Sequence, residues 1–434
     1  MARPLRSAAA ALTALGLLTA CSACSSGGSS GDSAKKTVIT FWDNNAGPAR
    51  TPLFQHLIDG FEKEHPEIEV KYVGVTSSEV AEKYNTAIAA HSTPDVGGVT
   101  TALLASLTAQ KALVPLDDRL AGSPLKGELS AAMLETSRAA AGGKGLYQLP
   151  SSGNQDVIWY RADKFEAAGI AVPKTWDELF AAAAKLTDKP ANQYGFTIRG
   201  GAGSGFQVLA EAYAYSGITG VFDADGKSTV DDPRNVELIA KIAAQYRNTT
   251  PEADVSNAYP QMLAQFQAGQ VMMVHHNLGS TKDVKSALGD KAAGMLLPAG
   301  PDGTATLANP VDGFGVFKNS KHQDAAWTFL EYLDSHASNS YWNENAGQIP
   351  ANTAAYADDW YVRSGITKQA GDALNSGKLV QPPVYLPQYS KITKTEAEPN
   401  FQKVLLGQMS PADFAASVAG ALTKAQADYR AKNG

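Results

Sequence analysis

The feature of the sequence that most constrains its fold is an alternation of strand-like and helix-like segments, which begins at Thr37. Residues 37–42 are β-branched or aromatic, as in a buried strand, and residues 52–64 place their apolar side chains on one helical face. Residues 68–75 alternate as a second strand, and residues 78–90 have a second helical pattern. Because alternating strands and helices favour α/β layers, the sequence predicts an α/β fold with mainly parallel sheets.

The composition excludes several classes of protein and of site. The chain has 434 residues, which is long enough for two or three globular units. Its 37 basic and 43 acidic residues give a net charge of −6, which argues against an electrostatic nucleic-acid binder. The two cysteines, Cys21 and Cys24, both precede the expected folded part. We therefore expect no disulfide, thiolate metal site or cysteine nucleophile in the body of the protein.

The first twenty residues have the pattern of an export signal. Arg3 and Arg6 precede an apolar stretch at residues 7–20, which is shorter than the ~20 residues that a spanning helix needs. Residues 1–20 are therefore predicted to be a signal peptide. No later segment has the length and apolarity of a membrane span.

Residues 18–21 (LTAC) resemble a bacterial lipobox, in which Cys21 carries the lipid. An ordinary secreted protein cut after Ala20 is the alternative. Residues 21–36 are rich in Ser and Gly, and we interpret them as a lipidated cysteine followed by a flexible tether. The expected location is the outer face of the cytoplasmic membrane, with the lipid as the only attachment.

Motifs that would indicate catalysis or a cofactor are weak in this chain. His275 and His276 follow an apolar strand, and adjacent strand residues face opposite ways, so the pair does not suit one metal ion. The glycines of residues 200–205 match neither a P-loop nor a dinucleotide fingerprint. We expect no catalytic residue, no metal and no cofactor. A carboxylate pair for glycoside hydrolysis stays open, because its separation of ~5–9 Å is a spatial property.

From residue 37 to the C-terminus, a series of short motifs is similar to the family 1 extracellular solute-binding proteins, the lipoproteins of carbohydrate ABC importers. The motifs are Thr40-Phe41-Trp42, residues 61–70 (FEKEHPEIEV), 93–96 (TPDV), 112–117 (ALVPLD), 145–150 (GLYQLP), 159–169 (WYRADKFEAAG), 173–179 (PKTWDEL), 266–273 (FQAGQVMM), 294–298 (GMLLP) and 325–330 (AAWTFL). Their order behind a lipobox makes the resemblance specific.

This resemblance implies two α/β lobes of the periplasmic-binding-protein type, which close on a solute about hinge crossings of the chain. Matching positions place lobe 1 at residues 37–153 plus about 313–345, and lobe 2 at residues 154–312 plus about 346–434. Ligands of open α/β sheets bind beyond the carboxyl ends of the strands, which selects the same loops as the resemblance.

A sugar needs aromatic rings for its C–H face and polar side chains for its hydroxyl groups. The candidate ligand-binding residues, chosen from expected strand ends, crossings and positions matching the family, are Trp42, Asp43, Asn44, Thr100, Asn154, Arg199, Phe206, His276, Asn277, Asp312, Phe314, Trp360 and Tyr361. Each has a structural alternative: Trp42 as a core ring, Arg199 as a surface ion pair, or Trp360 and Tyr361 as a core patch. Asn352 stands where the family often has arginine, which favours a neutral ligand.

We interpret the chain as a monomeric, non-enzymatic receptor that captures a sugar or short oligosaccharide and delivers it to the permease subunits of an ABC importer. Two alternatives remain open from the sequence. One is an extracellular lipoprotein hydrolase acting on glycans. The other keeps the fold and takes a polyamine, a polyol phosphate or a metal chelate.

Overall fold

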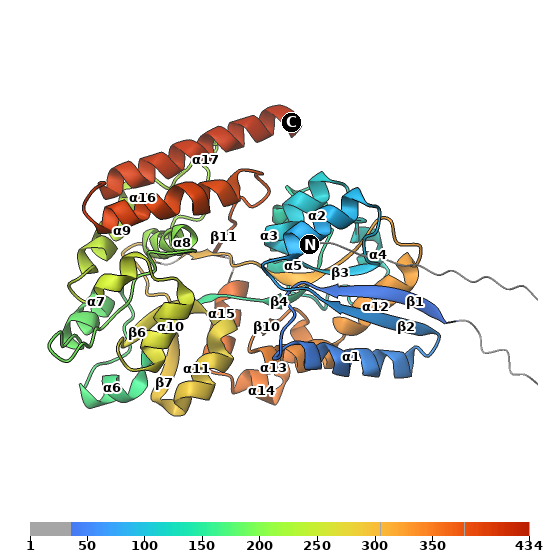
Figure 1. The fold of residues 1–434 in the computed structure, drawn as a ribbon, viewed down its shortest axis with the longest axis horizontal. Helices are drawn as coiled ribbons and strands as arrows, with labels where there is room; N and C mark the ends of the chain where they lie inside the picture. Colours follow the sequence, from blue (N-terminus) through green and yellow to red (C-terminus); the bar gives the residue numbers. More distant parts are fainter. Residues whose placement is uncertain (1–35, 304, 377, 434) are drawn as a thin grey trace, which may run out of the picture. The chain divides into compact units, whose positions relative to one another are not determined.

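A computed structural model describes residues 36–303, 305–376 and 378–433. The predicted signal peptide, Cys21 and all of the predicted tether except Lys36 lie outside these residues. In the described part of the chain, no helix combines the length and the apolarity that crossing a bilayer requires. Residues 36–434 form one compact unit, whose elements are shown in Figure 1.

The first sheet has six strands in the order β10-β4-β9-β3-β1-β2. They are β1 (Thr37–Asp43), β2 (Ile68–Gly74), β3 (Val96–Thr100), β4 (Leu149–Gly153), β9 (Asp312–Val316) and β10 (Ile349–Pro350). Strand β1 pairs in parallel with β2 and β3, whereas β9 runs antiparallel between β3 and β4. Since β3 and β4 are both antiparallel to β9, they run in the same direction as β1 and β2.

The second sheet has three strands in the order β6-β5-β7. They are β5 (Asp156–Arg161), β6 (Met273–Asn277) and β7 (Ala292–Leu296), and both pairings are antiparallel. A small parallel pair joins β8 (Thr306–Leu307) to β11 (Leu379–Val380). The chain passes from the first sheet to the second within residues 153–156, and it returns from β8 to the first sheet within residues 307–312.

The prediction of mainly parallel sheets is wrong. Among the described strands, three pairings are parallel and five are antiparallel. A strand–helix alternation yields parallel pairing when each helix returns the chain to the same end of one sheet. Here β9 enters the first sheet from the region of the second, so it runs against β3 and β4. The lobe boundaries given above stay a prediction.

Helices cover the sheets and account for most of the remaining chain. Their bounds are α1 (Thr51–Glu64), α2 (Val80–Ala89), α3 (Thr101–Ala109), α4 (Asp117–Ala121), α5 (Ala131–Ala140), α6 (Ala162–Ala167), α7 (Trp176–Lys185), α8 (Ser204–Ser216), α9 (Pro233–Gln245), α10 (Tyr259–Gln267), α11 (Thr281–Leu288), α12 (Gln323–Leu333), α13 (His336–Ala346), α14 (Asp359–Val362), α15 (Ile366–Asn375), α16 (Ala397–Leu405) and α17 (Pro411–Asn433). A π-helical turn at Lys391–Glu396 precedes α16. The expected helices at residues 52–64 and 78–90 are present as α1 and α2.

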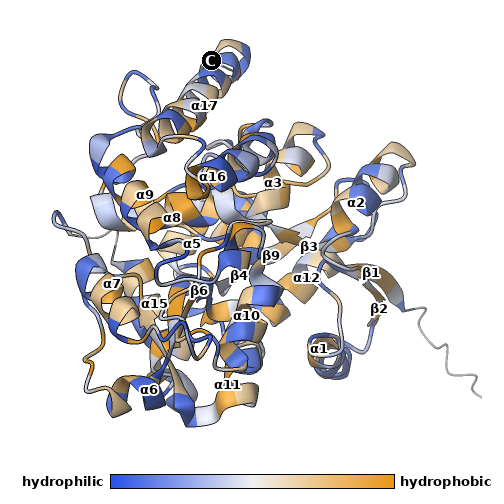
Figure 2. Cartoon of the chain, turned by 60° about the vertical axis from the view of Figure 1, so that its left-hand side comes forward, coloured by the Kyte–Doolittle hydropathy of each residue, from blue (hydrophilic) through white to orange (hydrophobic). Residues whose placement is uncertain are grey.

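Apolar side chains on opposite elements fix these positions. Ile39 and Phe41 lie two residues apart on β1, so they point to the same face of the sheet, and both are completely buried. The ring of Phe41 contacts Phe54 of α1 edge to face, with the ring centroids 5.0 Å apart. Helix α8 is buried along nearly its whole length, and Figure 2 shows the hydrophobic residues gathered on such interior elements. Helices α16 and α17 pack beside α8 and α9, as Figure 1 shows.

Candidate functional site: a cavity at the strand ends

Polar side chains gather at one edge of the first sheet, where β1, β3 and β4 have their carboxyl ends. Thr100, the last residue of β3, lies opposite Asp312, the first residue of β9. Ser152 of β4 lies opposite the other side of Asp312. Oδ2 of Asp312 accepts a hydrogen bond from Nε2 of Gln348 at 3.1 Å. The antiparallel insertion of β9 therefore places a carboxylate among the ends of the parallel strands.

Asp43 ends β1 at the same edge, and it is almost completely buried. Its carboxylate accepts hydrogen bonds from the hydroxyl of Tyr72 at 2.8 Å and from the amide of Asn45 at 3.0 Å. Burial raises the pKa of Asp43, and the charge of Asp312 adds to the increase, against the opposing effect of Arg50. Because the carboxylate of Asp43 is engaged in these hydrogen bonds within the protein, it stabilises the turn that carries Asn44 and Asn45.

The second sheet meets this edge through the short crossing at residues 153–156. Asp156, the first residue of β5, lies opposite Asn277, the last residue of β6. Asn154 accepts a hydrogen bond from the amide of Gln155 through Oδ1 at 3.0 Å, and Asn277 accepts one from the amide of Gly279 at 3.0 Å. The crossing therefore brings the polar ends of the two sheets next to each other.

The two adjacent histidines of β6 face opposite ways, as the strand pattern predicts. His275 is buried with Nδ1 at 2.6 Å from Oε1 of Glu211. The ring of His276 stacks on Tyr259 with the centroids 3.3 Å apart, and burial together with the charge of Arg199 lowers its pKa to about 3. Within the described ranges, no group of three or more His, Cys, Asp or Glu side chains is placed to hold a metal ion.

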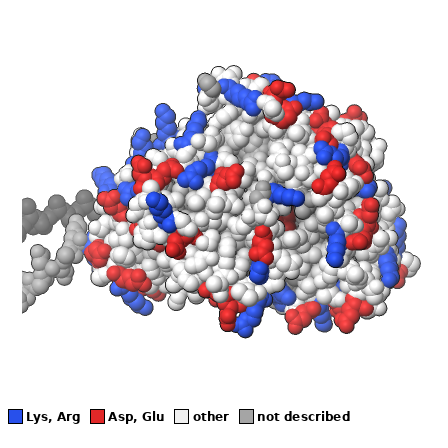
Figure 3. Space-filling view, turned by 180° about the vertical axis from the view of Figure 1, so that it is seen from behind, with Lys and Arg blue, Asp and Glu red and all other residues white. Residues whose placement is uncertain are grey.

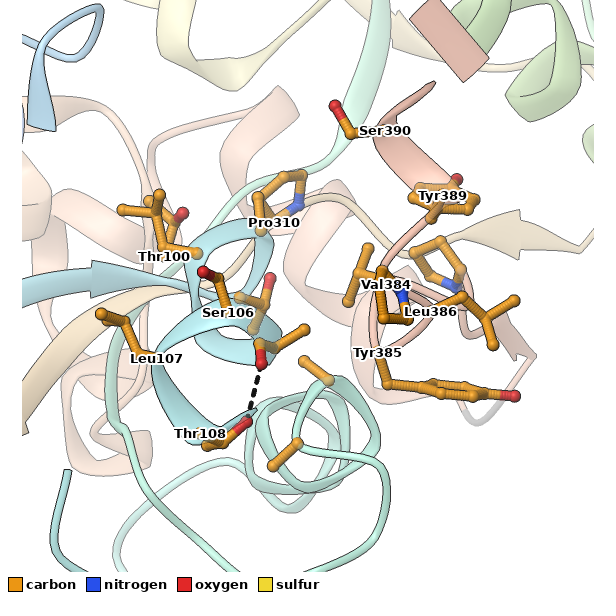
Figure 4. A pocket seen from close by; sticks show the side chains of 18 of the residues that line it. Thr100, Ser106, Leu107, Thr108, Pro310, Val384, Tyr385, Leu386, Tyr389 and Ser390 are labelled. Carbon is orange, nitrogen blue, oxygen red and sulfur yellow. Dashed lines mark hydrogen bonds between the residues drawn. The ribbon is translucent and has the colours of Figure 1, made fainter. Parts of the chain in front are cut away.

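A cavity of about 1350 Å³ opens at these strand ends. Helix α3 forms one wall, and residues 384–390 form the facing wall (Figure 4). In Figure 4, Ser106 and Thr108 of α3 lie across the cavity from Val384 and Tyr385, with Thr100 and Pro310 above them in this view. Five of the predicted residues line the cavity, and they come from both sheets and from α8: Asn44, Thr100, Phe206, Asn277 and Asp312.

Two polar atoms in the cavity wall have no hydrogen-bond partner among the described residues. They are Nδ2 of Asn309 and Oε1 of Gln388. Asn309 is only 4% exposed. The two atoms have almost no accessible surface themselves, although their residues line the cavity. A buried polar group without a partner costs about 1–3 kcal/mol.

The glycine-rich loop before α8 is closed by the protein's own groups. The amide of Gly203 donates to Oε1 of Glu398 at 2.6 Å, and Nε of Arg199 donates to the carbonyl of Ala202 at 2.6 Å. Burial lowers the pKa of Arg199, although the charges of Glu398 and Asp156 oppose that decrease. A carboxylate already occupies the amide that would otherwise attract an anion, so this loop is not a phosphate cradle.

Eight of the predicted residues do not line the cavity: Trp42, Asp43, Asn154, Arg199, His276, Phe314, Trp360 and Tyr361. The half-buried ring of Trp42 stacks on Tyr84 at 5.8 Å, with Nζ of Lys83 4.5 Å from its centroid. Phe314 is buried against Phe41.

Trp360 and Tyr361 lie together in α14, away from the cavity wall. Nε1 of Trp360 donates to Ser340 at 2.8 Å, and Tyr361 stacks on Tyr356 with the ring centroids 4.9 Å apart. Asn352, which stands where the family often has arginine, is buried and donates to the carbonyl of Asp334 at 3.0 Å.

The wall formed by residues 384–390 is the part of the site that was missed from the sequence. Tyr385 and Tyr389 lie there between and after prolines, in the run Pro382-Pro383-Val384-Tyr385-Leu386-Pro387-Gln388-Tyr389. Such a run cannot continue a helix and presents aromatic rings on an irregular backbone. That pattern is the signal that could have found it, whereas Asn309 has no distinctive local pattern.

The sequence profile of the family "Bacterial extracellular solute-binding protein" matches residues 47–340, more than half of the chain. The chain belongs to this family. Its members are non-catalytic solute-binding proteins, and this chain is a solute-binding protein of the ABC-transporter type. This finding removes the glycan hydrolase alternative.

Relatives and solved structures agree with this membership. A binding protein of Brucella abortus (strain 2308) is 27% identical over 324 residues, which cover 72% of this chain and 76% of that protein. YcjN of Escherichia coli (strain K12), named as an ABC transporter periplasmic-binding protein, is 24% identical over 78% of each chain. The GacH receptor of Streptomyces glaucescens has a TM-score of 0.77 and 25% identity, covering 91% of this chain and 99% of that one.

MalE3 of T. maritima matches with a TM-score of 0.75 and 23% identity, over 89% of this chain and 99% of that chain. The predicted two-lobed α/β fold of the periplasmic-binding-protein type is therefore confirmed.

Proposed function

We propose that this solute-binding protein captures a neutral carbohydrate, a sugar or short oligosaccharide, in the cavity at the strand ends and delivers it to the permease subunits of an ABC importer. The observation that carries the proposal is the make-up of the cavity wall. It combines the half-buried rings of Phe206 and Tyr385 with the accessible polar side chains of Asn45, Ser106 and Asn277. Aromatic faces suit the C–H side of a sugar ring, and polar side chains that donate and accept suit its hydroxyl groups.

The charges around the cavity support a neutral solute over an anionic one. Asp312 and Glu398 line the cavity and are half-buried, whereas the lining lysines, such as Lys111 and Lys394, are exposed. A phosphate placed beside α8 would face the Glu398 carboxylate that already accepts from Gly203. Among relatives, an sn-glycerol-3-phosphate-binding protein of Pectobacterium atrosepticum is 23% identical, but its anionic ligand does not match this arrangement.

The names of similar proteins support the same class of solute. The GacH receptor was solved with acarbose, and MalE3 of T. maritima with maltose. A solute-binding protein of Agrobacterium vitis that holds D-mannitol is 25% identical, with a TM-score of 0.67. Polyols are therefore the second class of solute to test.

A ligand in this cavity contacts side chains that belong to both sheets. Asn44, Thr100 and Asp312 belong to the first sheet, and Asn277 belongs to the second. A solute that binds both sides favours the state in which they are close, through its differential affinity for that state. The permease then recognises the closed form.

We also propose that a lipid on Cys21 anchors the protein to the outer face of the membrane, with residues 21–36 as the tether. The support is the sequence of residues 18–21. Cys21→Ala should release the protein from the membrane fraction, because a diacyl anchor holds where a single chain is marginal. A variant that stays with the membrane would contradict the lipobox interpretation.

The test of the binding function is a thermal-shift screen of the purified chain from residue 25 onward against monosaccharides, oligosaccharides, polyols and polyol phosphates, followed by calorimetry on the solutes that bind. We expect a neutral sugar to raise the melting temperature and to be recovered unchanged. Stabilisation by glycerol phosphate but by no sugar would contradict the proposal.

A further inference from the structure

A second cavity of about 360 Å³ adjoins the main cavity where the end of α17 meets the loop that follows α5. We call it the outer cavity. It shares three lining residues with the main cavity, namely Tyr385, Tyr429 and Asn433. The same side chains therefore form the boundary between the two spaces.

We propose that the outer cavity is a distal subsite for the end of an oligosaccharide of three or more units, whose other end lies at the strand ends. The dimensions of the main cavity give the first reason. Nearly all of α3 lines it, and nine helical residues span about 13 Å. The volume of about 1350 Å³ exceeds the range of ~300–1,000 Å³ typical of small-molecule pockets. A single sugar ring would leave most of this groove empty.

The shape of the α3 wall gives the second reason. Ala102, Ser106 and Ala109 lie at the spacing that places them on one face of the helix, and all three are exposed. Their small side chains leave an open track along the helix. The track leads from Thr100 at the strand ends toward Lys111 at the far end of α3.

The outer cavity is built around an aromatic pair. The rings of Tyr385 and Tyr429 lie with centroids 4.9 Å apart, and the hydroxyl of Tyr385 donates to Oε1 of Gln426 at 2.7 Å. Gln426 is buried, so this bond fixes the orientation of Tyr385. A ring that is fixed in this way beside a second ring is the kind of surface on which a sugar ring stacks.

The loop after α5 is shaped to approach Tyr429. Gly142 has φ +69°, and a Cβ atom there would lie 2.4 Å from the hydroxyl oxygen of Tyr429. Nζ of Lys144 donates to Oδ1 of Asn433 at 2.9 Å and lies 5.8 Å from the centre of the Tyr429 ring. These contacts join the loop to the last turns of α17, so the outer cavity has walls on both sides.

The distal subsite presupposes the carbohydrate-binding function proposed above. The test uses size ladders, from one to six units, prepared by partial acid hydrolysis of starch, cellulose, xylan and galactan. Native mass spectrometry reads the mass of the sugar bound to the protein, and calorimetry gives its affinity. We expect chains of three or more units of one series to bind at least about tenfold more tightly than its disaccharide.

Two variants test the outer cavity in different ways. Tyr429→Ala removes one ring, and Ala139→Phe fills the space without removing a contact. Each should cut the advantage of the longer chains about tenfold. Because Ala139 lines only the outer cavity, Ala139→Phe should leave the affinity for the disaccharide as before. Tyr341→Ala, a half-buried tyrosine of α13 that lines neither cavity, is the matched control and should keep the wild-type preference.

The outcomes separate the two proposals. A wild-type protein that prefers one or two units, or an unchanged length preference in Ala139→Phe, overturns the distal subsite and leaves the binding function standing. If no oligosaccharide of any series and no monosaccharide binds, the proposed carbohydrate-binding function is itself contradicted.

Discussion

Nδ1 of His275 lies 2.6 Å from Oε1 of Glu211, and both side chains are buried. Nε2 of the same ring lies 3.7 Å from Oδ1 of Asp156, the first residue after the crossing between the sheets. Helix α8, β6 and the start of β5 are thus joined through one imidazole ring. Burial alone lowers the pKa of His275, but the carboxylates of Asp156 and Glu211 outweigh it and raise the pKa to about 9.

This pairing predicts a pH dependence of stability. A histidine whose pKa is about 9 when folded and about 6.5 when unfolded contributes stability below pH 6.5 that is lost as the pH rises toward 9. The urea midpoint of the wild type should therefore fall between pH 6.5 and 9, and that of His275→Gln should change much less. Parallel pH profiles of the two proteins would contradict a charged His275.

Asn309→Leu should weaken sugar binding without destabilising the ligand-free protein. The substitution removes the unpartnered Nδ2 in the cavity wall and replaces a buried polar group by an apolar one of similar shape. We expect a loss of affinity of about two- to tenfold, measured by calorimetry, with an unchanged or higher urea midpoint.

Asn235→Leu is the matched control, because the amide of Asn235 donates to the carbonyl of Thr229 and lines neither cavity. It should lower stability and leave affinity unchanged. An Asn309→Leu protein with full affinity would remove Asn309 from the proposed site.

Trp42→Ala should act on stability more than on affinity. Its ring is half-buried on Tyr84 and lies outside the cavity lining. Since a fully buried Trp→Ala costs ~3–5 kcal/mol, we expect about half of that from urea melts. A large loss of sugar affinity with an unchanged melt would restore Trp42 as a stacking platform.

Gly205→Ala should disturb the packing that carries Phe206 to the cavity. A Cβ atom at Gly205 would lie 1.9 Å from the carbonyl oxygen of Thr393, in the π-helical turn before α16. We expect a loss of about 1–3 kcal/mol of unfolding free energy in urea melts.

The control is Gly420→Ala in α17, where a new Cβ meets nothing within 4 Å. It should stabilise the protein by ~0.5–1 kcal/mol, because alanine favours a helix interior over glycine. Equal stability of the two alanine variants would show that α8 tolerates a shift away from Thr393.

The sequence by itself determined the local elements and the family. The strand patterns at residues 37–42 and 68–75 follow from neighbours in the chain, and β1 and β2 are present there. The opposite orientation of His275 and His276 also follows from the strand alone. Asn44 and Thr100 could be placed at the site because the carboxyl ends of parallel strands converge at one edge of a sheet, and Asp312 because it lies in an expected crossing.

Only the tertiary structure decided which ring lines the cavity and which packs in the core. Phe314, in an expected crossing, and Phe206, beside the glycine-rich loop, were both candidates from the sequence, yet Phe314 is buried against Phe41 and Phe206 lines the cavity. That choice depends on the side of the sheet against which distant segments pack. The antiparallel entry of β9, the wall at residues 384–390 and the contact between Lys144 and Asn433 all join residues far apart in the chain. Local propensity and periodicity carry no information about such pairings, which arise from the packing of the whole unit.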